Sequence, residues 1–175
     1  MDKAVIMNDI VLEPVENTDL NIAEMAEFAA SIWREYWTSI LPEGQAEYMI
    51  EKFQSKEAMK RQVESENYSY FYIVADGNRA GYTGLSCRDG YLFLSKLYIL
   101  KDFRHQHVAT RAFPFIVDFA KKHGYDRIVL TVYKGNVNAI RAYEKLNFRK
   151  TDATVTDIGS GYVMDDYIME YRCTD

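Results

Sequence analysis

Between Leu97 and Phe113 the sequence LYILKDFRHQHVATRAF passes from an aliphatic run, through residues rich in side-chain nitrogen, into a second apolar run. The two apolar runs predict a strand followed by a helix, so the segment RHQH at 104–107 is the loop that leads into the helix. The first turn of a helix presents unpaired backbone N–H groups and the positive end of the helix dipole. Together with the Arg and His donors, this arrangement predicts a site for an anion such as a phosphate.

The charge distribution along the chain agrees with an anionic ligand near this loop. Residues 96–150 carry 12 Lys and Arg against 4 Asp and Glu, whereas residues 1–95 carry 8 against 16 and residues 151–175 carry 1 against 6. A basic segment favours a polyanionic ligand, and acidic surroundings favour a cationic one. Charge alone leaves open the alternative that these are solvated faces of opposite sign.

The composition is that of one soluble globular domain, which we expect to span residues 1–175. The chain is 48% hydrophobic and 27% charged, and it is long enough to bury a full core. No apolar run approaches the ~20 residues of a membrane span, and the first residues do not resemble a secretory signal. We therefore expect a cytoplasmic protein without a membrane partner. Cys87 and Cys173 are interpreted as reduced thiols, although a single bridge stays open.

Apolar periodicity and turn residues predict an α+β fold. The expected elements, in order, are a strand at 10–15, a helix from Asp19 capped by Thr18 or Asp19, short helices within 41–53 and 55–66, strands at 68–75, 79–87 and 91–100, a helix at 108–123, a strand at 127–133, a helix at 138–146, and a hairpin with arms at 148–158 and 162–171. Strand, helix and strand over residues 91–133 form a crossover, which predicts a parallel pair. We expect a mixed, mostly antiparallel sheet of about seven strands with helices on both faces.

Two blocks of the sequence resemble the GNAT N-acetyltransferase superfamily. LYILKDFRHQHVAT resembles its acetyl-CoA loop, Arg/Gln-x-x-Gly-x-Gly/Ala, with Arg104 and Ala109 at the two ends and His107 where glycine is usual. LTVYKGNVNAIRAYEKLNF resembles a later block, in which Asn136 follows a strand and Tyr143 lies in the next helix. The resemblance covers about residues 10–172 as an order of elements and 91–148 as motifs. Among non-glycine residues, His is one of those enriched at positive φ, so the loop tolerates His107.

The resemblance implies an acyltransferase that moves the acetyl group of acetyl-CoA to a primary amine, by direct attack in a ternary complex and without a metal. The acceptor is a small cationic or a peptidyl amine; the acidic flanks and the closing hairpin, which resembles that of bacterial members, favour a polyamine. In this interpretation the backbone at 97–99 pairs with the pantetheine arm, and the loop at 104–110 holds the phosphates. The residues assigned to the cofactor are Leu97, Tyr98, Ile99, Arg104, His105, Gln106, His107, Val108, Ala109, Thr110 and Asn136.

Tyr143 is the catalytic residue that the resemblance implies. A phenol with a pKa of ~10 can donate a proton to a departing thiolate with a pKa of ~8.5. Ile140 and Leu146 lie three residues to either side, so Tyr143 could instead belong to the apolar stripe of its helix.

The residue that removes the proton from the amine is not evident. The strand at 91–100 contains no Asp, Glu or His. A water chain, a backbone carbonyl, Glu35 or the pair Asp165-Asp166 remain as alternatives, and we interpret that pair as hairpin surface rather than as part of a site.

Other functions stay open as alternatives. A module that binds CoA or serves as an assembly partner without catalysis is favoured by His107 and by the missing strand carboxylate. A nucleic-acid partner is not expected, because the chain is acidic overall and lacks aromatic interleaving. His105-x-His107 lacks a nearby Cys or carboxylate to complete a metal site, so we expect no metal. Trp33, Tyr36 and Trp37 either wall a substrate cleft or belong to the core, and a homodimer is left open.

Overall fold

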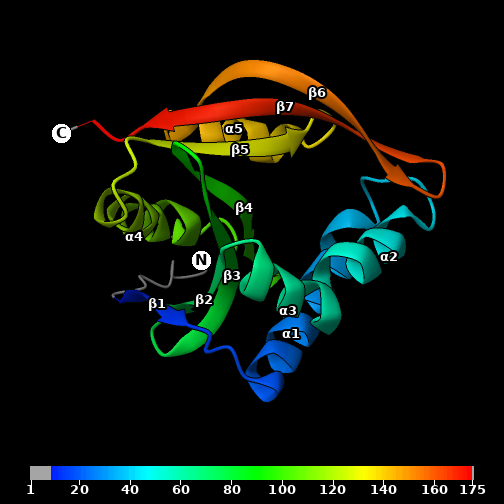
Figure 1. Ribbon diagram of the computed structural model, residues 1–175, viewed down its shortest axis with the longest axis horizontal. Coiled ribbons are helices and arrows are strands. Elements are labelled where there is room, and N and C mark those ends of the chain that lie inside the picture. The colour runs from blue at the N-terminus through cyan, green and yellow to red at the C-terminus, as the bar shows by residue number, and fades with distance from the viewer. Residues whose placement is uncertain (1–8, 175) are drawn as a thin grey trace, which may run out of the picture.

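A seven-stranded sheet in the order β1-β2-β3-β4-β5-β7-β6 runs through the computed structural model of the protein, which describes residues 9–174 (Figure 1). Only the β4–β5 pair is parallel, and the other neighbouring strands are antiparallel. The strands are β1 (Ile10–Pro14), β2 (Tyr68–Ala75), β3 (Asn78–Arg88), β4 (Tyr91–Ile99), β5 (Arg127–Tyr133), β6 (Arg149–Gly159) and β7 (Tyr162–Arg172). The predicted α+β class, the strand number and the single parallel pair are confirmed.

Helices occupy the segments where apolar periodicity predicts them, with one difference. They are α1 (Asp19–Trp37), α2 (Gln45–Met49), the π-helix η1 (Ile50–Gln54), α3 (Lys56–Ser65), the 3-10 turn η2 (Lys101–Phe103), α4 (Val108–Lys122) and α5 (Val137–Lys145). Thr18 and Ser55 cap α1 and α3 by accepting backbone N–H groups, each at 3.2 Å. The single helix expected within 41–53 is instead α2 continued by η1. A π-helical turn is rare and is frequently found at functional sites.

The helices cover both faces of the sheet, as predicted. One core contains the inner sides of α1, α2, η1 and α3 together with aromatic residues of β2 and β3. The second core lies between α4, α5 and the other face of β3, β4, β5 and β7. Figure 1 shows α4 on one side of β2, β3 and β4 and the helices α1, α2 and α3 on the other. Within residues 9–174, no helix combines the length and the apolar composition that crossing a membrane requires.

At Ser95, the alternation of side chains along strand β4 shifts, so that residues after Ser95 point to the opposite face of the sheet from the one that a regular strand would give. Leu94 lies opposite Leu85 of β3, whereas Lys96 lies opposite Gly84, so Ser95 is the extra residue of a β-bulge. On a regular strand, residues 94 and 98 would share one face of the sheet. Because of the bulge, Leu94 belongs to the α4–α5 core, while Tyr98 packs against the core of α1.

The bulge lies where β4 and β5 separate. The two strands pair only at Leu92 with Ile128 and at Phe93 with Val129. No further pairing between them occurs in the described residues, so the β5-facing backbone edge of β4 beyond Phe93 has no strand beside it. The sheet therefore has a gap between β4 and β5 beyond Phe93.

Candidate active site

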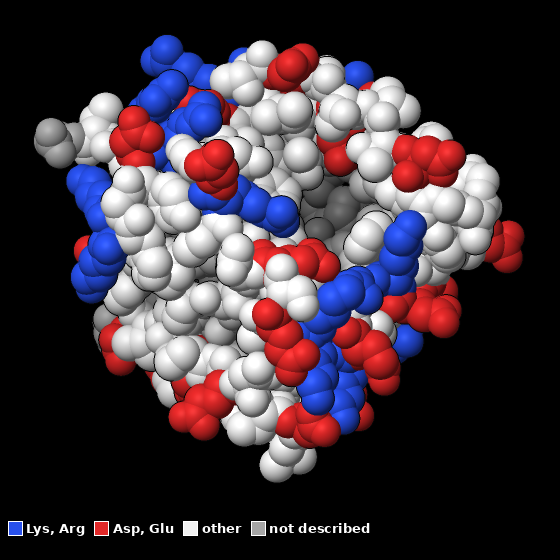
Figure 2. Space-filling view, viewed as in Figure 1, with Lys and Arg blue, Asp and Glu red and all other residues white. Residues whose placement is uncertain are grey.

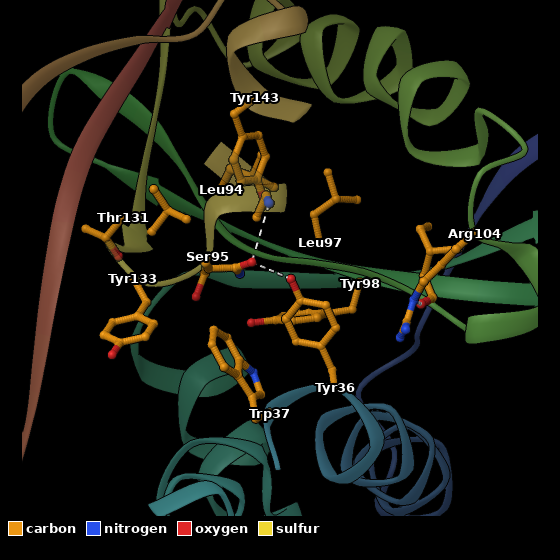
Figure 3. A pocket seen from close by; sticks show the side chains of 14 residues that line it. Tyr36, Trp37, Leu94, Ser95, Leu97, Tyr98, Arg104, Thr131, Tyr133 and Tyr143 are labelled. Carbon is orange, nitrogen blue, oxygen red and sulfur yellow. Dashed lines mark hydrogen bonds between the residues drawn. The ribbon is translucent and has the colours of Figure 1, made fainter. Parts of the chain in front are cut away.

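A cavity of about 110 Å³, here called the β4–β5 cavity, lies in this gap (Figure 3). Its walls come from β4, β5, α1 and α5 and from the loop that precedes each of α4 and α5. It brings together six of the residues that the sequence assigned to the site: Leu97, Tyr98, Ile99, Arg104, Asn136 and Tyr143. Of the three α1 residues considered as a cleft wall, Tyr36 and Trp37 also line this cavity, while Trp33 and Trp37 are buried in the core.

Tyr143 extends from α5 toward the β4–β5 cavity, as Figure 3 shows. The edge-to-face contact of its ring with Phe148, with centroids 5.5 Å apart, fixes the orientation of the phenol. Burial raises the pKa of Tyr143 well above its ordinary value, and the nearby Tyr36 raises it further. The phenol therefore keeps its proton across the physiological pH range, as a proton donor must.

The loop before α4 has the backbone geometry that glycine usually provides. His105 and His107 have φ angles of 59° and 60°, both in the left-handed region. The carbonyl of His107 accepts the first intrahelical bond, from the N–H of Arg111 at 2.9 Å. The N–H groups of residues 108–110 precede that bond and have no hydrogen-bond partner within residues 9–174, so they can bind an anion. The binding of phosphates by this loop stays a prediction.

The Arg104 side chain is held by groups of the protein itself. Its Nε donates to the carbonyl of Ile99 at 2.9 Å, and its Nη2 lies 3.0 Å from the carboxylate of Glu35. The guanidinium also lies over the Tyr36 ring, 5.3 Å from its centroid. Arg104 thus ties α1 to the end of β4 and occupies Glu35, one of the acids considered as a base.

A second cavity of about 160 Å³, here called the inner cavity, adjoins the first. The two cavities share four lining residues: Ser95, Tyr98, Thr131 and Tyr133. Figure 2 shows the surface hollowed between β5–β7 and α2–α3, the elements that contribute to this cavity. The gap between β4 and β5 is therefore lined by one cavity from each side of the sheet.

Asp166 lines the inner cavity and is 9% exposed, so its interpretation as hairpin surface is wrong. Its Oδ1 has no hydrogen-bond partner among residues 9–174. Burial raises the pKa of Asp166 to about 6; Asp165 adds to the increase, and Lys134 opposes it. Strand alternation is the sequence signal that could have found this residue, because Asp166 shares a face of β7 with Met164, which packs against the α1 core.

Lys96 also lines the inner cavity, and sequence reasoning treated it only as a polar exception in an apolar strand. It is 5% exposed, and its Nζ donates to the Phe53 carbonyl and to Oε1 of Gln62, each at 3.1 Å, and to the Tyr70 hydroxyl. Burial lowers the pKa of Lys96 well below its ordinary value. Three oxygen partners occupy its hydrogen-bonding capacity, so Lys96 holds η1 and α3 to the sheet.

Two further sequence-based interpretations concern Cys and His residues. Cys87 and Cys173 are free thiols, so the alternative of a bridge between them is wrong. Across the part of the chain that the structure describes, no group of three or more His, Cys, Asp or Glu side chains is arranged to bind a metal ion.

The sequence of the chain matches a known protein family. Residues 27–148 match the Acetyltransferase (GNAT) family, and the chain belongs to this family. It is similar to "Probable N-acetyltransferase camello" of Xenopus tropicalis (26% identity) and of Xenopus laevis (29% identity), in each case over 90 residues. These matches cover 50% of this chain and 41% of each relative, so the chain spans less than half the length of these curated relatives.

Solved structures show the same fold over nearly the whole chain. The PaiA N-acetyltransferase of Thermoplasma acidophilum, solved in complex with coenzyme A, has a TM-score of 0.74 at 21% identity, covering 94% of this chain and 99% of that one. The ribosomal-protein-S18-alanine N-acetyltransferase of Escherichia coli has a TM-score of 0.67 at 18% identity, with coverage of 95% and 96%. At these identities the likeness concerns the fold alone.

Proposed function

We propose that the protein transfers the acetyl group of acetyl-CoA to a primary amine by direct attack in a ternary complex. The observation that carries this proposal is the meeting of the two cavities at the gap between β4 and β5, with Tyr143 on one side and Asp166 on the other. Family membership and the coenzyme A complex of a structural neighbour support acetyl-CoA as the donor.

Acetyl-CoA enters from the side of α4 in this proposal. The left-handed loop at 104–107 and the first N–H groups of α4 hold the diphosphate. The backbone of Leu97–Ile99, which has no strand on its β5 side, pairs with the amide groups of the pantetheine arm. The thioester then lies in the β4–β5 cavity within reach of Tyr143.

The acceptor amine enters from the inner cavity. It arrives as an ammonium group, which the carboxylate of Asp166 attracts, and it must lose one proton before it attacks. At neutral pH this loss costs roughly 4 kcal/mol for an alkyl ammonium and about 1 kcal/mol for an α-amino group. The nitrogen, which has released its first proton to solvent, then bonds to the acetyl carbon, and it releases its second proton to solvent as the C–S bond breaks. The departing sulfur takes the proton of Tyr143, and solvent returns a proton to the phenol.

The release of free CoA thiol in the presence of a panel of amines tests this proposal. Turnover with at least one primary amine, together with an increase in melting temperature on addition of acetyl-CoA, is the expected result. Tight binding of CoA without turnover of any amine would instead favour a module that binds CoA without catalysis.

Three broader expectations stay predictions. A single domain over residues 1–175 is tested by limited proteolysis, a homodimer by analytical ultracentrifugation, and a cytoplasmic location by cell fractionation.

A further inference from the structure

Gln54 separates the inner cavity from a larger groove on the surface. The groove has a volume of about 860 Å³, lies along α1, α2 and η1 up to the β6–β7 turn, and is here called the outer groove. Gln54 is the last residue of η1, is 0% exposed, and lines both the inner cavity and the outer groove. Gln54 is therefore the lining residue that the inner cavity and the outer groove share.

The orientation of the Gln54 amide is set by a relay of hydrogen bonds. Nε1 of Trp33, which can only donate, donates to the Tyr82 hydroxyl at 2.7 Å. The Tyr82 hydroxyl in turn donates to Oε1 of Gln54 at 2.9 Å. The amide oxygen is therefore occupied by Tyr82. The amide nitrogen Nε2 is buried and has no hydrogen-bond partner among the described residues.

The lining of the inner cavity thus includes two residues, Gln54 and Asp166, whose buried side chains each have an unpaired polar atom, and the two atoms are of opposite kind. Nε2 of Gln54 is a donor without an acceptor, and Oδ1 of Asp166 is an acceptor without a donor. The other strong donor of this cavity, Lys96, is already bonded to three oxygens. Buried polar groups are normally paired, so an unpaired complementary set in a cavity indicates the polar groups of its ligand.

From this pair we infer that, if the protein is the acetyltransferase proposed above, its acceptor is an amine that carries an oxygen acceptor close to the nitrogen. Asp166 binds the ammonium group, and Nε2 of Gln54 donates to the oxygen. An amino-acid amide and the first residue of a peptide have both groups. A polyamine has donors only and leaves Gln54 unpaired, so the polyamine favoured by the charge pattern fits this cavity less well.

The size of the two spaces agrees with an acceptor of this class. A volume of about 160 Å³ equals roughly five water molecules. The inner cavity therefore has room for the amine and the adjoining carbonyl group of one small residue. Any continuation of the acceptor lies in the outer groove, on the other side of Gln54.

The test compares two acceptors of the same shape, glycinamide and isobutylamine, by kcat/KM corrected for the fraction of free amine. An unpaired buried donor typically reduces binding by about 10-fold to 100-fold. We expect a preference for glycinamide of at least about 10-fold, with putrescine no better than isobutylamine. Equal values for glycinamide and isobutylamine would overturn the inference and leave the proposed acetyl transfer intact.

Two variants test the role of Gln54 directly. Gln54→Met removes the donor at similar length, and Gln54→Glu, measured at a pH where its carboxyl is ionised, removes the donor but keeps the oxygen that Tyr82 needs. The preference for glycinamide is expected to fall toward 1 in both variants. Gln45→Met is the matched control, because Gln45 is also buried, lies on the preceding helix, donates to the Val163 carbonyl and lines neither the inner cavity nor the outer groove. An unchanged preference in the folded Gln54→Glu variant would contradict the inference.

The absence of turnover with every amine would contradict the proposed function. In that case a second measurement tests the recognition of the acceptor separately. The melting temperature of the CoA-saturated protein is then measured with glycinamide and with isobutylamine. A larger increase with glycinamide that is lost in Gln54→Glu supports the recognition of an oxygen-bearing amine. Equal increases, or none with either amine, would overturn it.

Discussion

Tyr36 of α1 donates a hydrogen bond of 2.6 Å to Oδ1 of Asn136, the residue that caps α5 (Figure 3). The same oxygen accepts the N–H of Ala139 at 3.4 Å. Both bonds use the amide oxygen, so only the amide nitrogen of Asn136 is left for a cofactor. The bond also joins α1 to the far side of the gap, because both residues line the β4–β5 cavity.

Tyr36→Phe is expected to weaken the binding of CoA by a few fold, because the Asn136 amide then turns more freely. Loss of one hydrogen bond is also expected to cost about 1 kcal/mol of stability. Calorimetric titration with CoA and chemical denaturation measure the two effects. An unchanged dissociation constant in the variant would show that the orientation of Asn136 does not matter to the cofactor.

Tyr143→Phe is expected to lower kcat by roughly 10²-fold to 10⁴-fold, the usual contribution of a positioned general acid. The dissociation constant of CoA should change little, because the ring and its contact with Phe148 remain. Thiol release at saturating substrates gives kcat, and calorimetric titration gives the dissociation constant. A kcat close to that of the native protein would remove Tyr143 from the mechanism.

Asp166 predicts an acid limb in the pH dependence of kcat/KM. Because its pKa is about 6 in the folded protein, the carboxylate that attracts the ammonium is lost as the pH falls through that value. We expect kcat/KM, calculated on the concentration of free amine, to decline below about pH 6 in the native protein. Asp166→Asn should lower kcat/KM at neutral pH and abolish this limb.

Ionisation of Asp166 is expected to raise kcat/KM but to lower the stability of the folded protein. A folded pKa above the ordinary value of 3.8 means that the folded state holds the proton more tightly. The contribution of Asp166 to stability is therefore fully present below about pH 3.8 and is lost as the pH rises through about 6. Asp166→Asn is therefore expected to match the native protein near pH 4 and to exceed its stability at pH 8 by at most about 3 kcal/mol. Denaturation at the two pH values measures the difference, and equal differences at both would contradict it.

Lys134→Met tests whether the decline of kcat/KM at acidic pH reports the pKa of Asp166. Lys134 forms an ion pair of 2.8 Å with Asp165 and lowers the pKa of Asp166, while Asp165 raises it. Removal of the Lys134 charge is therefore expected to raise the Asp166 pKa and to move the acid limb of kcat/KM to higher pH. A limb that moves to lower pH, or not at all, would indicate that it belongs to another group.

His107 has a left-handed backbone conformation, which a glycine at this position would adopt without strain. Its φ of 60° lies in the left-handed region, where β-branched residues are outliers. His107→Gly is expected to leave stability and CoA affinity within a few-fold of the native values, whereas His107→Val should cost about 1–3 kcal/mol. Thermal denaturation of both variants measures this. A native-like His107→Val protein would show that the left-handed conformation is not required.

The sequence was sufficient where local patterns determine the structure. The strands at 68–75 and 127–133 have their predicted bounds, since aromatic and β-branched runs end at clear turn residues. Thr18 and Ser55 could be recognised as caps because a capping side chain acts on an N–H group only three residues away. The residues of the GNAT motifs also identify one wall of the β4–β5 cavity.

The acceptor side could not be predicted, because its groups act through partners far away in the chain. Tyr36 and Asn136 are 100 residues apart, and the orientation of Gln54 depends on Tyr82, 28 residues away. The bulge at Ser95 follows from the pairing of β4 with β3, which no local pattern indicates. Strand alternation in β7 places Asp166 on the same face as Met164, but the burial of its carboxylate depends on the helices that cover this strand.

The central claim is that the gap between β4 and β5 holds the thioester, with the Tyr143 hydroxyl directed at the sulfur. The most direct test is a crystal structure of the protein with bound CoA. We expect the pantetheine arm to lie against the backbone of Leu97–Ile99 and the CoA sulfur to lie within hydrogen-bonding distance of the Tyr143 hydroxyl. A CoA molecule bound outside this gap, or a sulfur that points away from Tyr143, would contradict it.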